Sequence, residues 1–506
     1  MTDRQRPESA FASYNAAVDL LAANLATRAD KIAVIDDDGA YTYAEVARRV
    51  DRCGAAMLDR GAVAGDRVVL CLLDGVDLVA CFLGAIRIGL TPIPLNTLLT
   101  ADDYGYILND SGATMTIVSP SLRDRLRDGA RAAGWPGLVA GPDDLRDASP
   151  AQTHWTSPDT PAFWLYSSGS TGRPKGVIHR HGSLRDTADL FGGPVLGICA
   201  DDVVYSAAKL FFAYGLGNGL TFPFAVGATV VLHAGRATPE AVWDILARRG
   251  VTVFGGVPTL YAAMLSADAP TRDALPALRL CVSAGEPLPQ DIGARWTART
   301  GTEIIDGVGS TEMLHVFVSN RPGAVRYGTS GVAVAGYELK LLDETGVGAA
   351  SGVLGELYVR GPSAALGYWN QPEKTAHAFV DGWVRTGDQY RRDDAGDYVF
   401  CGRADDMLKV SGIWVSPAEV ESVLITHPAV LEAAVVGAPD ADGLIKVKAY
   451  VVLRADAAPS PAMVADLRAF AKTRLTPHKY PRDIAFVAAL PKTATGKIRR
   501  HVLREG

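Results

Sequence analysis

The stretch that decides the fold of this chain is residues 163–181, which read FWLYSSGSTGRPKGVIHRH. An apolar run leads into SSGSTG, where hydroxyl side chains and glycine-permitted turns bring hydrogen-bond donors close to an anion. The stretch is not a Walker A loop, because Lys175 is followed by Gly176 rather than by Ser or Thr. It predicts a phosphate-binding loop of another kind, and a flexible Ser/Gly linker is the competing interpretation.

On the N-terminal side of this loop, strand-like runs alternate with helical patterns. KIAVIDD at 31–37 is followed by TYAEVARRVDRCGAAMLDRG at 42–61 and then by DRVVLCLLDG at 66–75. Similar alternation resumes after the loop, near 251–256, 278–285 and 303–307. Such alternation predicts an α/β domain in which helices cover a sheet. From 331 to 359 short strands separated by Gly and Asp turns predict a β-rich subdomain.

The C-terminal fifth of the chain forms a separate pattern. GDYVFCGRADDMLKVSG at 396–412 reads as strand, turn and strand, and a compact α+β pattern follows it. With 506 residues, the chain is too long for one core, so at least two domains are expected. We expect a large N-terminal domain at 1–404, made of α/β subdomains and a β-rich subdomain. A small, mobile α+β lid domain at 405–506 completes the expected fold.

The composition excludes several classes of function. Hydrophobic residues make up 48% and charged residues 21%, as in an ordinary folded protein. The 50 Lys and Arg against 56 Asp and Glu give a formal net charge of -6, which argues against a nucleic-acid partner. The six cysteines include no CxxC pair, so we expect reduced thiols in a cytoplasmic protein rather than disulfides or a zinc site.

No membrane segment is expected. The N-terminus lacks the continuous apolar run of a secretory signal. Residues 210–232 carry no charge over a length that would span a bilayer, but they include Asn218, Pro223 and several glycines. These residues favour turns beside a ligand cavity, so we expect a buried helix, turn and strand there.

Further motifs follow the phosphate loop in a fixed order. They are SAGEPLP (283–289), DGVGSTEM (306–313), WVRTGDQY (383–390), CGRADDMLKVSG (401–412) and PKTATGK (491–497). Together with the loop they resemble the adenylate-forming superfamily of acyl-CoA synthetases, peptide-synthetase adenylation domains and firefly luciferase. The likeness extends from about Phe11 to the end of the chain. It implies an enzyme that uses ATP and Mg²⁺ to convert a carboxylic acid to its acyl adenylate and then transfers the acyl group to coenzyme A.

The resemblance also implies which residues hold the nucleotide. The residues matched to ATP or AMP contacts are Ser167, Ser168, Gly169, Ser170, Thr171, Gly172, Lys175, Gly285, Glu286, Pro287, Asp306, Gly307, Asp388 and Arg403. Asp388 is matched to a carboxylate that accepts hydrogen bonds from the ribose, and Arg403 to a guanidinium on the same nucleotide. Either one alone is equally typical of a surface ion pair.

Three residues are matched to catalysis. Thr311 and Glu312 resemble a phosphate-contacting hydroxyl and a carboxylate that helps to hold Mg²⁺ on ATP, and oxygen ligands suit that cation. Lys497 resembles the lysine whose ammonium lowers the barrier when a carboxylate attacks the α-phosphorus. Its competing interpretation is a solvated lysine in a basic tail. Asp405 is matched to the hinge about which the lid rotates, and Lys409 and Gly412 to the lid face that approaches coenzyme A.

The likeness is sharpest to bacterial benzoate–CoA ligases and their hydroxybenzoate and aminobenzoate relatives. It implies that the acid pocket is lined by Ala213, Tyr214, Gly255, Ala284, Gly309, His315 and Val316. Aromatic and small residues together make a flat slot that fits a planar ring. A lone buried aromatic residue or His315 is also typical of an ordinary core. Gly255 and Val316 are smaller than their counterparts in that subgroup, which would enlarge the slot, so a substituted benzoate is as credible as benzoate.

Two other functions stay open at this point. One is a stand-alone adenylation enzyme that loads an aryl acid onto the phosphopantetheine of a carrier protein. The other is a regulatory protein that binds a nucleotide or acyl group without catalysis. The oligomeric state is not indicated by the sequence.

Overall fold

The computed structural model describes residues 13–145, 151–167, 173–266, 270, 272–410, 413–440, 444–455, 457–492 and 498–505. Within these residues a nine-stranded sheet forms the centre of the large domain. Its strands in spatial order are β15 (Val332–Ala333), β14 (Val316–Ser319), β13 (Ile304–Gly309), β12 (Leu280–Ser283), β11 (Val253–Gly256), β9 (Val203–Ser206), β10 (Thr229–Val231), β1 (Ile32–Ile35) and β2 (Ala40–Thr42). The six strands from β13 to β1 are parallel.

Helices cover both faces of this sheet, as expected when parallel strands are buried on both sides. One face packs Tyr205 and Phe254 against Trp243, Tyr261 and Trp296. The helices of that face are α9 (Pro239–Arg248), α10 (Pro258–Ser266) and α11 (Gln290–Thr300). The other face is covered by η4 (Ala188–Gly192), α7 (Ala213–Leu216), η5 (Gly217–Thr221) and α8 (Phe222–Val226), and α6 (His181–Thr187) packs beside η4 and η5.

A second, parallel sheet with the order β4-β3-β5-β6 lies in the N-terminal part of the chain. Its strands are β4 (Thr91–Pro94), β3 (Arg67–Cys71), β5 (Met115–Val118) and β6 (Leu138–Ala140). The helices around it are α1 (Ala16–Arg28), α2 (Tyr43–Asp59), α3 (Val76–Arg87), α4 (Ala101–Ser111) and α5 (Arg123–Ala132). A capping box of Thr42 and Glu45 begins α2. Helices α2 and α3 cross closely, because a Cβ at Gly54 would lie 2.8 Å from the Gly84 carbonyl oxygen.

Two antiparallel sheets connect these layers to the C-terminal part. The first has the order β18-β8-β7, formed by β7 (Pro161–Ser167), β8 (Lys175–Arg180) and β18 (Gly367–Tyr368). The second contains β16 (Glu338–Leu342), β17 (Gly355–Arg360), β19 (Phe379–Val380), β20 (Trp383–Arg392) and β21 (Tyr398–Arg403), with α12 (Pro372–Ala378) beside it. This is the predicted β-rich subdomain, and it extends beyond the expected residue 359 to Arg403.

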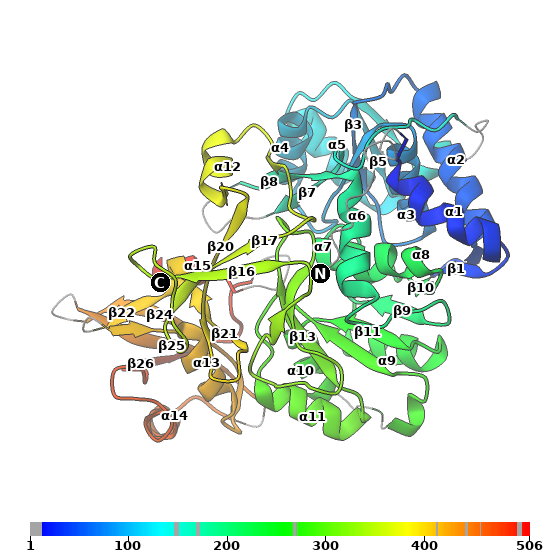
Figure 1. Cartoon of the computed structure of the whole chain (residues 1–506). Helices are drawn as coiled ribbons and strands as arrows, with labels where there is room; N and C mark the ends of the chain where they lie inside the picture. Colours follow the sequence, from blue (N-terminus) through cyan, green and yellow to red (C-terminus); the bar gives the residue numbers. More distant parts are fainter. Residues whose placement is uncertain are drawn as a thin grey trace.

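The remaining elements form a smaller unit with a core of its own, drawn from residues 408–486. Figure 1 shows this unit in orange and red to one side of β20 and β21. Its elements are η7 (Ala404–Asp406), β22 (Leu408–Val410), β23 (Ile413–Val415), α13 (Pro417–Ile425), β24 (Val430–Pro439), β25 (Ile445–Leu453), α14 (Pro461–Lys472), β26 (Asp483–Phe486) and α15 (Arg500–Glu505). The expected fold of a large and a small domain is confirmed. The boundary at residue 405 and the mobility of the lid stay predictions.

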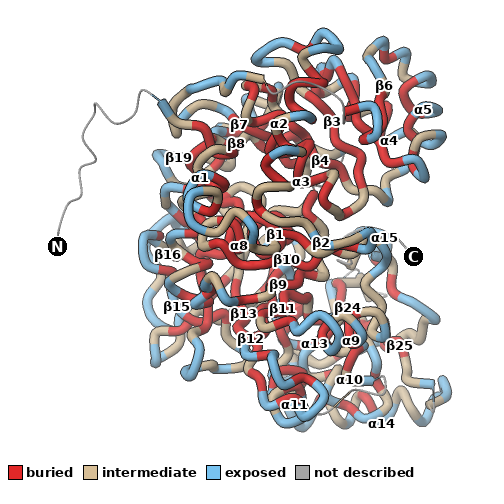
Figure 2. Tube along the Cα trace, turned by 90° about the vertical axis from the view of Figure 1, so that its right-hand side faces the viewer, coloured by how far each residue is buried: buried red, intermediate tan, exposed pale blue. Residues whose placement is uncertain are grey.

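Burial follows the sheets, and Figure 2 shows the buried trace running along β1, β10, β9 and β11. The apolar stretch at 210–232 forms α7, η5 and α8 and then enters β10, so the predicted helix, turn and strand are confirmed. Among the described residues, no helix combines the length and apolar character needed to cross a membrane. All six cysteines are free thiols, as predicted.

Candidate functional site

The predicted site residues lie where four neighbouring parallel strands end. Strands β9, β11, β12 and β13 are adjacent in the central sheet, and parallel strands present their carboxyl ends at the same edge. Segment 207–214 follows β9, Gly255 is the penultimate residue of β11, Ala284 to Pro287 follow β12, and Thr311 and Glu312 follow β13. Ligands of open α/β sheets bind in the crevice at such an edge.

The phosphate loop is carried by a β-hairpin. Its first strand ends at Ser167 and its second begins at Lys175, and these two residues face each other across the antiparallel pair. Ser168, Gly169, Ser170, Thr171 and Gly172 lie outside the described residues. The hairpin therefore fixes both ends of the predicted loop, and the Ser167 hydroxyl has no hydrogen-bond partner among the described residues.

Glu312 lies at the centre of the charged part of the site. Its Oε1 atom is 3.4 Å from Lys175 Nζ and accepts a 2.8 Å hydrogen bond from the Tyr368 hydroxyl. The Lys175 ammonium also lies 3.7 Å from the centroid of the Tyr368 ring. Burial opposes ionisation of Glu312, but Lys175 and Tyr368 together hold the pKa of its carboxyl below the usual value. Burial lowers the pKa of Lys175, and Glu312 opposes that shift.

A tight turn presents Glu312 to the crevice. Leu314 adopts φ 63°, a left-handed conformation that is rare for a residue with a side chain. The turn is closed by hydrogen bonds from the Met313 amide to Ser310 and from the Leu314 amide to the Thr311 carbonyl. Strands β13 and β14 then pair so closely that a Cβ at Gly309 would lie 2.5 Å from the His315 carbonyl oxygen.

The same crowding applies to Gly307, where a Cβ would lie 2.6 Å from the Val318 carbonyl oxygen. The glycines of DGVGS therefore have a packing reason that is independent of any nucleotide.

The predicted ribose pair is formed between two strands. Asp388 on β20 and Arg403 on β21 face each other, with Oδ1 and Nη1 2.7 Å apart. Arg403 Nη1 also donates to the Thr386 carbonyl oxygen at 2.9 Å. Gly387 has φ 71°, which any other residue adopts only with strain. The Arg403 guanidinium thus orients the Asp388 carboxylate independently of a bound ligand.

The predicted adenine wall follows β12. Gly285 adopts φ 93°, so the chain turns sharply before Glu286 and Pro287. Asp306 on β13 faces Ser283, the last residue of β12. Asp306 is buried, and burial raises the pKa of its carboxyl to about 8. The group is therefore mostly protonated at pH 7 and is able to donate a hydrogen bond.

This protonation makes a prediction about stability. In the unfolded chain an aspartate ionises near pH 4, whereas folded Asp306 does so near pH 8. Between those values the unfolded state binds fewer protons, so the free energy of unfolding falls as the pH rises. We expect Asp306→Asn to lose less stability between pH 5 and pH 8 than the wild type does in urea unfolding.

Asp202→Asn is the matched control. Burial raises the pKa of Asp202, but hydrogen bonds from Arg279 and Thr252 outweigh it and lower the pKa to about 2. The stabilisation from this group is lost only below about pH 4, so its removal changes stability equally at pH 5 and pH 8. An unchanged pH slope in Asp306→Asn would contradict a protonated Asp306.

Four of the predicted aryl-pocket residues meet directly. The Tyr214 hydroxyl donates to the carbonyl oxygens of Gly256 at 3.1 Å and Val282 at 2.9 Å, which ties α7 to β11 and β12. Its ring stacks on His315 with centroids 5.5 Å apart. A Cβ at Gly255 would lie 3.5 Å from the Tyr214 hydroxyl oxygen. Gly309, as described above, lies against His315.

For the other three predicted aryl-pocket residues, the structure shows which hydrophobic core each one belongs to. Ala284 and Val316 are buried in the core cluster against which Tyr214 packs. Ala213 packs instead against the cluster formed by the N-terminal helices. The place of Ala213 in the aryl pocket stays a prediction.

The environment of His315 includes two phenylalanines that the sequence did not single out, and Asn218, which the sequence indicated only as a turn residue. Phe191 and Phe222 enclose its ring at centroid distances of 5.2 and 4.5 Å. Asn218 donates to the Tyr214 carbonyl oxygen at 3.0 Å, and its Nδ2 lies 3.4 Å from His315 Nε2. Burial lowers the pKa of His315 to about 3, so the ring is neutral at pH 7. The sequence signal was present, since Asn218 is a polar residue in an apolar run.

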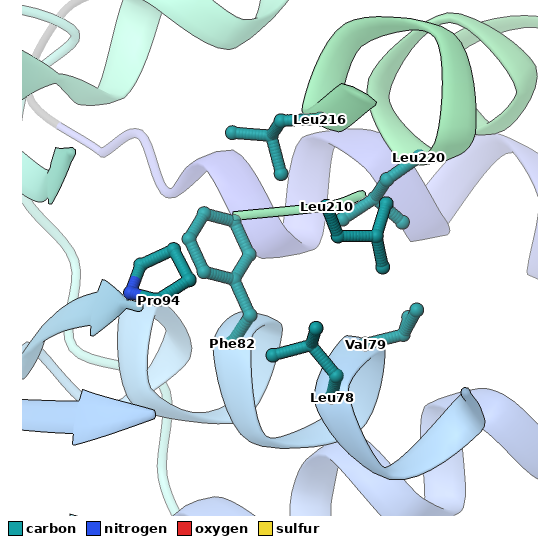
Figure 3. A pocket seen from close by; sticks show the side chains of 7 residues that line it. All are labelled: Leu78, Val79, Phe82, Pro94, Leu210, Leu216 and Leu220. Carbon is teal, nitrogen blue, oxygen red and sulfur yellow. The ribbon is translucent and has the colours of Figure 1, made fainter. Parts of the chain in front are cut away.

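An apolar seam lies behind the pocket segment. Figure 3 shows that side chains of α3 and the segment 210–220 face each other across it. The residues that line this seam are Leu78, Val79, Phe82, Pro94, Leu210, Leu216 and Leu220. The seam has no polar side chain and is too narrow for a water molecule, so it packs the pocket wall against the N-terminal helices.

The predicted hinge residue lies in a short 3₁₀ turn, Ala404–Asp406. The last helix is held against this turn, because Arg504 bonds to Asp406 and Arg500 Nη1 lies 3.5 Å from the same carboxylate. Arg500 also pairs with Glu421 at 2.8 Å. Lys409 lies over the Trp414 ring at 5.0 Å. Lys497 and Gly412 lie outside the described residues.

The chain resembles known proteins over nearly its whole length. The family described as AMP-binding enzyme matches residues 21–369, and the family described as AMP-binding enzyme C-terminal domain matches residues 419–497. A benzoate–CoA ligase of Thauera aromatica is 54% identical over 97% of this chain and 96% of its own.

Two solved structures are similarly close. A benzoate CoA ligase from Burkholderia xenovorans LB400 is 51% identical, with a TM-score of 0.92 over 97% of this chain and 100% of its own. An anthranilate CoA ligase in complex with anthranoyl-AMP is 40% identical, with a TM-score of 0.94 over 100% of this chain and 98% of its own.

Proposed function

The chain belongs to the AMP-binding enzyme family, and on that premise we propose that it is an ATP-dependent aryl acid–CoA ligase. It joins a benzoate-type acid to AMP with release of pyrophosphate, and then transfers the aroyl group to the thiol of coenzyme A with release of AMP. The names of its relatives support this class of acid. Their soluble substrates and the six free thiols support a cytoplasmic location.

One observation carries this proposal. The turn between β13 and β14 supplies both Glu312, beside Lys175, and His315, which stacks on Tyr214. Only two residues, Met313 and Leu314, therefore separate a carboxylate suited to a metal–phosphate group from a wall suited to an aromatic ring. An aryl acid in that pocket would have its carboxylate near the α-phosphorus of ATP, which is the arrangement that adenylation requires.

The residues at Glu312 fit a magnesium ion. Mg²⁺ is usually held by one or two carboxylates together with substrate phosphates rather than by a protein cage. Glu312 is ionised, partly buried and balanced by a side-chain ammonium, and the described residues contain no cluster of three or more metal-ligating side chains. When bound with ATP, the cation would neutralise charge on the phosphate oxygens.

Different residues act in the two half-reactions. In the first, Lys175 and Lys497 supply positive charge to the phosphates while Tyr214, Gly255 and His315 orient the acid. Asp388 and Arg403 hold the nucleotide. In the second, rotation about Asp405 removes Lys497 and brings the face that carries Lys409 and Gly412 toward the adenylate, so that the thiol attacks the acyl carbon and AMP leaves.

The experiment that tests this function measures the products. Purified protein is incubated with ATP, Mg²⁺ and benzoate, first without and then with coenzyme A. We expect pyrophosphate and benzoyl-AMP in the first case and benzoyl-CoA and AMP in the second. A holo-carrier protein acting as acceptor in place of coenzyme A would favour the carrier-loading enzyme, and nucleotide binding without any pyrophosphate would favour a regulatory protein.

The acid pocket allows a prediction about specificity. A Cβ at Gly255 would lie at ordinary contact distance from Ser206, Tyr214 and Asn218, at 3.5 to 3.6 Å. A methyl group fits there, whereas a tyrosine ring must occupy space in the slot. We expect wild-type protein to accept at least one ring-substituted benzoate about as well as benzoate, and Gly255→Tyr to shift preference tens-fold toward benzoate, about 1–3 kcal/mol.

Gly255→Ala is the control, since its added methyl makes only ordinary contacts. The readout is the ratio of kcat/KM values for benzoate, hydroxybenzoates, aminobenzoates and a medium-chain fatty acid. If Gly255→Tyr left the ranking of the acids by kcat/KM unchanged, Gly255 would not line the acid pocket. A wild-type preference for the fatty acid would overturn the aryl assignment.

A further inference from the structure

We propose that Tyr368 is a positioning residue of the Mg²⁺–ATP site, which it serves by holding Glu312 and Lys175 in place. The inference rests on the proposed function, in which these two side chains act on the metal and the phosphates. The Tyr368 hydroxyl donates to Glu312 Oε1 at 2.8 Å, and the ring face lies 3.7 Å from the Lys175 ammonium. One side chain thus contacts both charged groups.

The backbone around Tyr368 gives this contact a fixed geometry. Strand β18 pairs with β8, the strand that begins at Lys175, and Tyr368 faces Val177 in the register. The Trp369 amide donates to the Gly176 carbonyl oxygen at 2.9 Å, and the Tyr368 amide donates to Thr375 at 3.0 Å. Tyr368 is 7% exposed, so its ring has little freedom to turn.

The same segment also holds the turn that carries Glu312. The Ala365 amide donates to the Glu312 carbonyl oxygen at 2.8 Å, and the Ser363 hydroxyl donates to the Met313 carbonyl oxygen at 2.8 Å. Residues 363–368 therefore form hydrogen bonds both with the backbone of the turn that carries Glu312 and with the Glu312 side chain. These contacts join parts of the chain about fifty residues apart, so they are tertiary and not local.

The two contacts of Tyr368 have different chemical consequences. The hydroxyl hydrogen bond satisfies one lone pair of Glu312 Oε1 and orients the carboxylate. Hydrogen-bond partners that orient a metal-ligating side chain in this way raise the affinity of the site for the metal. The ring face attracts the ammonium by a cation–π interaction, which keeps Lys175 beside Glu312 in the absence of nucleotide. Burial and the neighbouring Glu312 raise the pKa of Tyr368, so its hydroxyl stays protonated and remains a donor.

The test removes the hydroxyl and keeps the ring. Tyr368→Phe is compared with wild-type protein in the binding of Mn²⁺, used as a paramagnetic substitute for Mg²⁺, in the presence of a non-hydrolysable ATP analogue. We expect the variant to bind Mn²⁺ about 10- to 100-fold more weakly, as found when such supporting partners are lost. The apparent KM for Mg²⁺ should rise in pyrophosphate release, while kcat at saturating metal changes far less.

Tyr43→Phe is the matched control. Tyr43 is also a buried tyrosine, and its hydroxyl makes a 2.7 Å hydrogen bond to the Ala228 carbonyl oxygen in the core of the N-terminal helices. We expect it to lose a similar amount of thermal stability and no Mn²⁺ affinity. Equal Mn²⁺ affinity in Tyr368→Phe and wild type would overturn the role of Tyr368. Absence of any Mn²⁺ binding by the wild-type complex would instead overturn the proposed function.

Discussion

Lys497→Ala is expected to lower the rate of adenylate formation by at least a hundred- to a thousandfold, the usual effect of removing a group aimed at developing charge. The reason is that the carboxylate and the α-phosphate are both anionic when they approach each other. Arg500, three residues later, starts α15 and lies close enough to Glu286 for the two charges to interact.

The measurement separates the two half-reactions. Pyrophosphate release from ATP and benzoate reports adenylation, and coenzyme A attack on supplied benzoyl-AMP reports thioester formation, which needs no ammonium at phosphorus. Lys492→Ala is the control within the same motif, because Lys492 pairs with Glu432 at 2.7 Å on the surface and such a pair contributes little. Equal loss of both half-reactions in folded Lys497→Ala would contradict this division.

Glu312→Gln is expected to lower adenylation by about a hundredfold, because a neutral amide is a poor ligand for Mg²⁺ and the loss of one metal contact corresponds to roughly 3 kcal/mol. The variant also deprives Lys175 of its ion-pair partner. The loss of adenylation rate should exceed that in Tyr368→Phe. Glu312→Gln removes the proposed metal-binding carboxylate, whereas Tyr368→Phe removes only a hydrogen bond that orients it. Adenylation rates are measured across a range of Mg²⁺ concentrations.

Glu356→Gln provides the comparison for this experiment. Glu356 is similarly buried and pairs with Arg385 at 2.6 Å, but it lies on β17 in the β-rich sheet. We expect its substitution to leave the Mg²⁺ dependence unchanged. If Glu312→Gln showed the Mg²⁺ dependence and rate of the wild type, Glu312 would not be the metal-binding carboxylate.

The periodic parts of the fold were predictable from local pattern. The alternation of strand-like and helical patterns at 31–75 predicts the strands β1 and β3 and the helix α2, because the spacing of apolar residues reflects which of them are buried. The strand order of the central sheet was not predictable, since β1 pairs with β10 about 195 residues later and no local pattern records that pairing. The glycine and asparagine residues in 210–232 did predict its turn, because they disfavour a continuous spanning helix.

Where a motif carries them, candidate site residues could be named from the sequence, since Glu312 lies in DGVGSTEM and Asp388 in WVRTGDQY. Tyr368 was missed because its contact is with Glu312, 56 positions away. Asn218 was named only as a turn residue, because its contact with His315, 97 positions away, leaves no local pattern. The resemblance implies that Ala213 lines the pocket; in the structure it packs against the core of the N-terminal helices, whereas Tyr214 packs against another core cluster, and its role in the pocket stays a prediction. The roles of the nucleotide-binding, catalytic, pocket, hinge and lid residues all stay predictions, those of Lys497, Asp405 and Gly412 included.

The most direct test of the account is benzoate-dependent exchange of labelled pyrophosphate into ATP in the absence of coenzyme A. Exchange requires that the enzyme form an acyl adenylate reversibly and hold it, which is the central claim. We predict exchange with benzoate or a ring-substituted benzoate, and benzoyl-CoA with AMP once coenzyme A is added. No exchange with any aryl acid, or formation of ADP and phosphate in place of AMP and pyrophosphate, would contradict the account.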